Sequence, residues 1–191
     1  MGNMTVKIRM HPAYADFIKF DFDSDENGRV FATERKPIGL LIKNLLSLQP
    51  ENAVKRDYEK DAYIEFTLPY YKDINIQYRN YISLASERLI AKKIKNQFYF
   101  ELNEFILETF GAGHEEFRSA IVLFCEQMEI RETSYKINTI EKEYRRYRSR
   151  QKTAKKAHKM SSTLMALFSY ICPTLFLFAL ISHQNTLSVL L

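Results

Sequence analysis

Cysteine and tryptophan are scarce in this 191-residue chain, which contains two cysteines and no tryptophan. Cys125 and Cys172 lie far apart, and no Cys-x-x-Cys motif or Cys/His cluster accompanies them. A disulfide framework or a structural zinc site needs several cysteines or histidines at close spacing. The pattern therefore argues against both, and we expect two reduced thiols.

Motifs that carry catalysis are also missing. The sequence contains no G-x-G-x-x-G, P-loop, H-E-x-x-H or G-x-S-x-G pattern, and these patterns bring together the residues for cofactor binding or hydrolysis. Its four histidines, His11, His114, His158 and His183, are scattered along the chain. We therefore expect a non-enzymatic protein without a cofactor.

Negative charge disappears toward the C-terminus, and then all charge disappears. Residues 1–134 contain 18 Lys/Arg and 21 Asp/Glu, a net charge of −3, whereas residues 135–160 contain 10 Lys/Arg and two Asp/Glu, a net charge of +8. Residues 161–191 contain none of these four residue types. We interpret the three parts as a mixed α+β body, a basic helical arm that continues the last body helix, and an apolar tail.

Alternation of apolar and polar residues in the body predicts short strands at 5–10, 63–68 and 74–82. Residues 69–73 would join the last two strands. The expected result is a small N-terminal antiparallel sheet.

Helical spacing of apolar residues predicts a short helix from Pro12 and a second from Pro37. Their expected apolar faces are Tyr14, Phe17 and Ile18 in the first, and Ile38, Leu41, Leu45 and Leu48 in the second. A longer helix follows with Ser83 or Ser86 as its cap, and Gly111 is placed to end it.

Two more helices complete a helical C-terminal half. One covers residues 114–128, Ile130 fills the turn after it, and a third helix capped by Thr133 or Ser134 becomes basic. In a helix-turn-helix the second helix of the motif enters the major groove. The sequence therefore predicts a helix-turn-helix-like three-helix arrangement with the basic helix in the recognition position.

The basic arm is the main candidate for binding. Eight Lys/Arg lie between Arg145 and Lys159 with no acid between them, and such density neutralises phosphates and releases their counterions. The candidate nucleic-acid-binding residues are Arg145, Arg146, Arg148, Arg150, Lys152, Lys155 and Lys156, with Lys92 and Lys93 in a second cluster that also holds Arg88 and Lys95. Two alternatives stay open, a solvated helix face and an arm that binds anionic lipid.

The apolar tail contains a candidate transmembrane helix at 164–182, which is 19 residues without a charge. About 20 apolar residues cross the hydrocarbon core as a helix. Lys and Arg precede this segment and none follows it, so the positive-inside rule keeps the body in the cytoplasm. We expect a protein at the cytoplasmic membrane, or a cytoplasmic one if the tail is a buried oligomerisation helix or has no function.

A stretch near the N-terminus, DSDENGRVFATE at 23–34, has the spacing of an EF-hand calcium loop. Gly28 occupies the sixth position, where such loops turn sharply. Oxygen ligands occupy the first, third, fifth and twelfth positions, which are Asp23, Asp25, Asn27 and Glu34. Ca²⁺ is therefore an alternative cofactor.

The residues around this loop favour a turn instead. Lys19 stands where an EF-hand helix has an apolar residue, and Pro37 would lie inside the exit helix at a cost of about 3 kcal/mol. Asn27-Gly28 is typical of tight turns, and we expect a positive φ at Gly28. We therefore prefer a turn between the strand-like segments IKFDF and RVFAT, with no metal.

Three segments, KIRMHPAYADFIKF, FCEQMEI and IEKEYRRYR, resemble uncharacterised small accessory proteins of phage-like or conjugative mobile elements of gut bacteria. The resemblance covers about residues 5–150 and leaves out the tail. It implies an accessory or DNA-associated protein and no established activity. The leading hypothesis is therefore a nucleic-acid-binding accessory or regulatory protein tethered to the membrane; the alternatives are a membrane-anchored interaction module and a calcium-binding protein.

Overall fold

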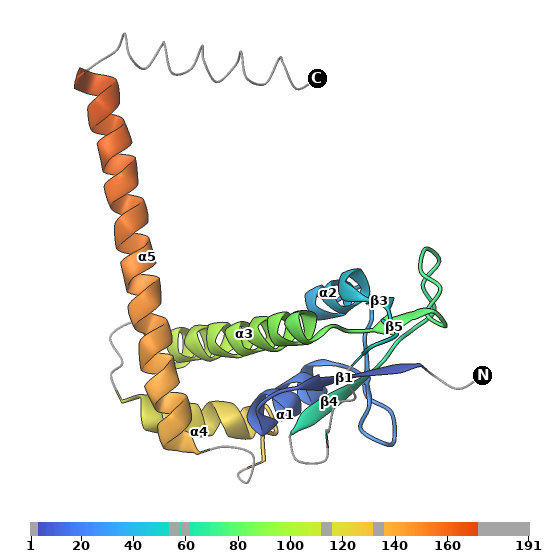
Figure 1. Cartoon of the computed structure of the whole chain (residues 1–191). Coiled ribbons are helices and arrows are strands. Elements are labelled where there is room, and N and C mark those ends of the chain that lie inside the picture. The colour runs from blue at the N-terminus through green and yellow to red at the C-terminus, as the bar shows by residue number, and fades with distance from the viewer. Residues whose placement is uncertain (1–3, 54–57, 59–61, 112–115, 132–135, 172–191) are drawn as a thin grey trace. The chain divides into compact units, whose positions relative to one another are not determined.

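The computed structural model describes residues 4–53, 58, 62–111, 116–131 and 136–171. The described strands all lie in the first half of the chain together with two short helices, and the second half is helical, so the predicted α+β class is confirmed (Figure 1). The elements are β1 (Thr5–Arg9), α1 (Pro12–Asp21), β2 (Val30–Phe31), α2 (Pro37–Leu45), β3 (Ser47–Leu48), β4 (Tyr63–Thr67), β5 (Arg79–Tyr81), α3 (Leu84–Phe110), α4 (Phe117–Gln127) and α5 (Ile137–Ile171). The chain divides after Glu143 into two units, each described by itself.

The main sheet has three strands in the order β1-β4-β2 and is mixed rather than antiparallel as predicted. Strands β1 and β4 pair antiparallel with Ile8 opposite Ile64, whereas β2 pairs parallel to β4. Between β2 and β4 the chain passes through α2, and a crossover of this length is what a parallel pair needs. The prediction of a purely antiparallel sheet was wrong because the pairing of β2 with β4 is parallel.

Strands β3 and β5 form a separate two-stranded antiparallel sheet. The strand predicted at 74–82 is therefore short, and it does not form a hairpin with β4. Asn75 explains the shortening, because its side chain accepts a hydrogen bond from the Gln77 N–H and its carbonyl accepts from Tyr78 and Arg79. These hydrogen bonds hold residues 75–79 in a turn, although their composition is typical of a strand.

Helix α1 starts at Pro12 as predicted and buries Tyr14, Phe17 and Ile18. It continues through Asp21, so the segment IKFDF is mostly helical and its prediction as a strand was wrong. The helical spacing of the three large apolar residues outweighs the short polar alternation that follows them. Figure 1 shows α1 beside β1 and β4.

Helix α2 starts at Pro37, but its buried face differs from the predicted one. Ile38 and Ile42 are buried, whereas Leu41 is only half-buried and Leu48 lies outside the helix in β3. Gly39 sets this orientation: a Cβ placed there would lie 1.9 Å from the backbone oxygen of Thr33. The helix can therefore pack closely against the backbone at Thr33 only through the face that carries Gly39.

Helix α3 is the element around which the first unit packs. The Ser83 side chain accepts a hydrogen bond from the Ser86 N–H at its start, and Gly111 ends it with φ +80°, both as predicted. Phe98 is fully buried, and its ring contacts those of Tyr14, Phe17, Tyr99 and Phe124 at centroid distances of 5.2–5.5 Å. This aromatic cluster joins α1, α3 and α4.

Candidate nucleic-acid interface

The basic arm lies on α5, which is helical without interruption from Ile137 to Ile171. No glycine or proline occurs within these bounds, and residues with good helix propensity dominate residues 141–157. The Thr153 hydroxyl donates to the Ser149 carbonyl at 3.0 Å, a bond within the helix. The arm therefore offers a straight, regular spacing for its charges.

Five cations of the arm share one face of α5. The first four follow one another at steps of three or four residues, and the fifth lies four residues after the third, which brings their side chains to the same face of an α-helix. We call this set the basic stripe, and it consists of Arg145, Arg148, Lys152, Lys155 and Lys156. Four of them are exposed and Arg148 is half-exposed. At about 1.5 Å per residue the stripe is about 16 Å long.

The other two arm residues of the prediction, Arg146 and Arg150, are exposed but lie on a different face of α5. At about 100° per residue, both lie about 80° or more around the helix from every member of the basic stripe. The run of arginines in the sequence concealed this division. It provides two groups of cations on one helix that face in different directions.

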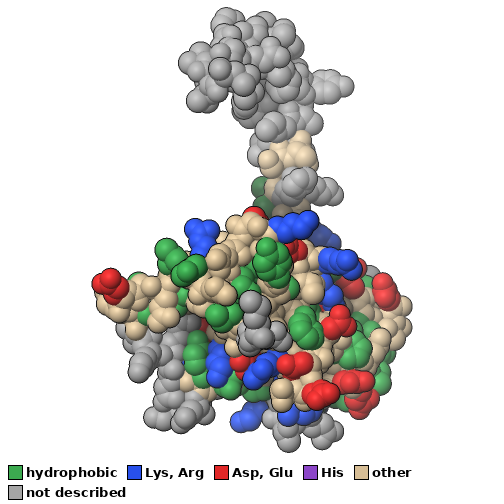
Figure 2. Space-filling model, turned by 90° about the vertical axis from the view of Figure 1, so that its right-hand side faces the viewer, with side chains coloured by type: hydrophobic (Ala, Val, Ile, Leu, Met, Phe, Trp, Pro, Cys, Tyr) green, Lys and Arg blue, Asp and Glu red, His purple; other side chains and the backbone are tan. Residues whose placement is uncertain are grey.

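No carboxylate lies within the basic stripe, because Glu143 is the last acidic residue of the chain. On the body, by contrast, Figure 2 shows a face where Lys/Arg, Asp/Glu and hydrophobic side chains are interspersed. Next to the stripe the rings of Tyr144 and Tyr147 are stacked, with centroids 6.5 Å apart and planes at 20°. The arm therefore concentrates positive charge beside a pair of aromatic rings.

The second predicted cluster is on α3. Lys92, Lys93 and Arg88 are exposed there, whereas Lys95 forms an ion pair with Glu143 at 2.6 Å. These residues belong to the first unit and the basic stripe to the second. A joint footprint of the two clusters stays a prediction.

The connection between α4 and α5 is longer than a helix-turn-helix has. Helix α4 ends at Gln127 and α5 begins at Ile137, so nine residues, 128–136, connect them. DNA-binding helix-turn-helix motifs use about three or four residues. Ile130 is buried as predicted, while the predicted caps Thr133 and Ser134 lie outside the described residues. The case for nucleic acid therefore rests on the basic stripe and not on motif geometry.

Glu143, two residues before the run of cations in the arm, is the centre of a polar cluster that no sequence pattern indicated. Its Oε2 accepts hydrogen bonds from the hydroxyls of Tyr99 at 2.9 Å and Tyr14 at 3.2 Å, and pairs with Lys95 at 2.6 Å. The two hydroxyls lie 3.1 Å from each other. The residues come from α1, α3 and α5, and no local sequence signal connects them.

The negative charge of this cluster is on the Glu143 carboxylate. Burial alone raises the pKa of its carboxyl, but hydrogen bonds from Lys95 and Tyr99 outweigh that effect and hold the pKa below its ordinary value. Burial raises the pKa of both the Tyr14 and Tyr99 hydroxyls above the ordinary range. The tyrosines therefore serve as neutral donors to a carboxylate, an arrangement that anchors the first turns of α5 within the first unit.

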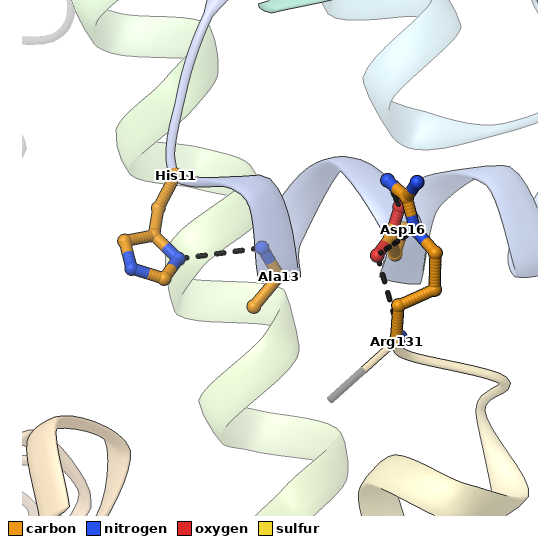
Figure 3. A network of polar contacts seen from close by, with 4 residues as sticks. All are labelled: His11, Ala13, Asp16 and Arg131. Carbon is orange, nitrogen blue, oxygen red and sulfur yellow. Dashed lines mark hydrogen bonds and ion pairs between the residues drawn. The ribbon is translucent and has the colours of Figure 1, made fainter. Parts of the chain in front are cut away.

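Two further polar contacts involve the start and the middle of α1, on either side of Tyr14 in the sequence (Figure 3). The His11 Nδ1 accepts from the Ala13 N–H at 3.3 Å and so caps the helix. Burial lowers the pKa of the His11 ring below its ordinary value. Asp16 is almost fully buried and accepts two hydrogen bonds from the guanidinium of Arg131, at 2.9 and 3.1 Å. This forked pair ties the segment after α4 to α1.

The loop at 23–34 forms a turn. Gly28 has φ +71°, as predicted, and its N–H donates to the Asp25 carbonyl at 2.9 Å. The Asp25 side chain accepts from the N–H groups of Asn27 and Arg29, both at 2.9 Å. Ser24 and Val30 form an antiparallel bridge across the turn. The flanking segments are α1 and β2, not two strands.

Glu34, the residue at the twelfth position of the calcium signature, is bound by an internal cation. Lys43 pairs with Glu34 at 3.0 Å and with Asp73 at 2.8 Å, and only 10% of the Lys43 side chain is exposed. Hydrogen bonds to Asp73 and Glu34 raise the pKa of Lys43. Among the described residues, no group of three or more His, Cys, Asp or Glu is placed to hold a metal ion.

The candidate transmembrane segment 164–182 falls mostly outside the described residues. Its first part, up to Ile171, is the end of α5, and residues 172–182 are not described. Within the ranges that the structure does describe, no helix is both long and apolar enough to cross a membrane.

Comparison of the chain with protein-family models, with curated proteins and with solved structures found no match.

Proposed function

We propose that the protein binds nucleic acid through the basic stripe of α5 and is held at the cytoplasmic membrane by residues 164–182. The observation that carries the first part is five cations on one face of a continuous helix with no acid among them. A row of this kind neutralises neighbouring phosphates, and each contact gains affinity by releasing a counterion. The protein would act as a non-enzymatic accessory or regulatory factor.

Distance along the helix supports nucleic acid over lipid as the partner of the stripe. If the bilayer core begins at Leu164, the rise of about 1.5 Å per residue puts Lys156 about 12 Å and Arg145 about 28 Å from it. The headgroup layer is only about 5–7 Å thick and the Debye length is about 8 Å. On a helix near the membrane normal, Arg145 and Arg148 would therefore be beyond the reach of lipid charge.

Two variants of equal charge test the stripe. Arg148→Gln/Lys152→Gln removes two charges from the stripe, and Arg146→Gln/Arg150→Gln removes two charges from the rest of the arm. With full-length protein in nonionic detergent and a short DNA duplex, the first variant should lower the slope of log affinity against log salt by about 1.8, since each phosphate contact contributes about 0.9. The second should leave the slope nearly unchanged.

Equal losses from both variants would show that the arm acts by net charge alone, without a stripe. Binding of the parent protein to anionic vesicles but not to duplex DNA, both at low salt, would replace the proposal by lipid binding.

Membrane attachment needs its own test. The full-length protein should sediment with membranes and resist extraction by alkali and by high salt. Leu175→Arg/Phe178→Arg should release it, at about 2.5–3.5 kcal/mol per charge near the centre of a spanning helix. Release of the parent by salt alone would contradict a spanning tail.

A further inference from the structure

One side of α3 carries a row of exposed side chains that combines apolar and charged residues. At about 100° per residue, these residues fall within a sector of about 80° around the helix axis. We call this set the outer stripe, and it consists of Leu89, Lys93, Asn96, Phe100, Glu104 and Leu107, all of them exposed. Its three large apolar side chains are 39–55% exposed. Exposed apolar side chains that share one face are typical of contact surfaces.

Packing within the first unit uses the other sides of α3. Phe98, at the centre of the aromatic cluster, lies about 160° around the helix from the middle of the outer stripe. Tyr99 and Lys95, which contact Glu143, lie about 100° or more from it. The outer stripe therefore faces away from the contacts that hold the first unit together.

The apolar residues of the outer stripe are arranged symmetrically about position 98 of the chain. Leu89 lies nine residues before that position and Leu107 nine residues after it. Asn96 and Phe100 lie two residues before and two residues after it. A twofold axis perpendicular to α3 at position 98 would therefore bring Leu89 of one copy opposite Leu107 of a second copy. Phe100 would in the same way be opposite Asn96.

The charges of the outer stripe fit the same axis. Lys93 lies five residues before position 98 and Glu104 six residues after it, and both are at the same border of the stripe. In an antiparallel pair of α3 helices, Lys93 of one copy would lie about 1.5 Å along the helix axis from Glu104 of the other, and this pair would occur twice. A parallel pair would put like charges beside each other. Charge complementarity therefore favours the antiparallel pair.

We propose that the protein forms a homodimer in which the outer stripes of two copies pack antiparallel about a twofold axis at position 98. Asn96 would lie near that axis, where a polar side chain fixes the register of a helix pair at some cost in affinity. Because one helix from each copy makes a small interface, we expect a dissociation constant in roughly the micromolar range. This inference goes beyond the proposed function, which needs only one copy of the protein.

Charge reversal tests the pairing, with the full-length protein in density-matched nonionic detergent and sedimentation equilibrium as the measurement. Lys93→Glu turns both ion pairs into like-charge pairs and should raise the dissociation constant of the dimer about 10- to 100-fold. Lys93→Glu/Glu104→Lys restores opposite charges and should return the constant to within about threefold of the parent value. Lys19→Glu is the control, because it makes the same change at an exposed position of α1, which packs on the inner side of α3.

Cysteines placed in the outer stripe test its direction. The background is Cys172→Ser, in which the remaining cysteine, Cys125, is fully buried. Leu89→Cys protein mixed with Leu107→Cys protein should form a disulfide-linked dimer on mild oxidation, because the antiparallel pair brings these positions together. Either protein alone should not, since like positions would be about 27 Å apart along the axis. Non-reducing gels separate linked from unlinked chains.

Several results would overturn the proposal. One is a parent protein that stays monomeric at about 100 μM, well above the expected dissociation constant. Another is a dimer whose affinity Lys93→Glu leaves unchanged or lowers no more than Lys19→Glu does, because such a dimer is held together elsewhere. A double variant as weak as Lys93→Glu, or no disulfide in the mixture, would do the same. Neither experiment contains DNA or a membrane, so failure of the dimer is distinguishable from failure of the proposed function.

Discussion

The first unit and the arm are stabilised in different ways. In the first unit, residues far apart in sequence are packed together, as the fully buried Phe98 illustrates. In the arm, no residue between 145 and 157 is buried, and the helix is maintained by its own backbone bonds and side-chain propensities. The body therefore depends on its interior, whereas the arm can be altered one side chain at a time. This is why charge variants of the basic stripe should report on binding and not on folding.

The largest difference should appear within one helix. Phe98→Ala removes a buried ring from the aromatic cluster and should lower the free energy of unfolding by about 3–5 kcal/mol. Phe100→Ala, two residues further along α3 where the ring is 55% exposed, should cost less than about 1 kcal/mol. Urea denaturation followed by tyrosine fluorescence measures both. Similar losses would mean that packing is not concentrated on the inner face of α3.

A methyl group added at Gly39 should be nearly as harmful. Alanine is the better helix former by about 1 kcal/mol, but its Cβ would meet the Thr33 backbone at 1.9 Å, and overpacking costs about 1–3 kcal/mol or more. We expect a net loss of about 2 kcal/mol. Gly111→Ala is the control, because its φ is +80° but nothing lies within 4 Å of the added Cβ. Stabilisation by Gly39→Ala in thermal melts would contradict the close contact.

Glu143 lies at the boundary of the two regions, and its replacement should have an intermediate effect. Glu143→Gln removes the charged acceptor of Lys95, Tyr14 and Tyr99 and should cost about 1–2 kcal/mol at pH 7. Because the folded-state pKa of Glu143 is lowered, its contribution is fully present above the unfolded value of about 4.3 and is lost as pH falls through the folded pKa. Unfolding free energies measured from pH 7 to 3 should therefore converge for parent and variant. A constant difference down to pH 3 would contradict the assignment.

The smallest effect should be found in the arm. Ala154→Gly should weaken the local helix by about 1 kcal/mol and leave the main unfolding transition unchanged. Ala120→Gly in α4, where the side chain is fully buried, should lower that transition as well. Hydrogen exchange followed by mass spectrometry separates local from global opening. A lower global transition for Ala154→Gly would show that the arm is part of the cooperative core.

Local chemistry determined which features the sequence could predict. Pro12 and Pro37 at helix starts, Ser83 as a cap, Gly111 as a helix end and the positive φ of Gly28 all depend on a few neighbouring residues. Each of these predictions was confirmed. The mixed sheet could not be predicted in the same way, because the parallel pairing of β2 with β4 depends on the path of α2 between them.

The candidate sites show the same limit. The density of Lys and Arg predicted the arm, but only the helix separates the stripe from Arg146 and Arg150. The cluster around Glu143 unites residues 14, 95, 99 and 143, and no spacing rule covers such distances. Likewise, the calcium signature identified Glu34 but gave no indication that Lys43 would bind it.

The order of strands in the main sheet also has a consequence for how the protein is made. Strands β1 and β2 are both hydrogen-bonded to β4, although β4 is the last of the three in the chain. A nascent chain that ends before Thr67 therefore carries two strands whose edges have no partner within the sheet. On a ribosome adding about 5–20 residues per second, the N-terminal segment waits several seconds for the strand that completes it. During synthesis, β1 and β2 therefore remain without their sheet partner until β4 has been made.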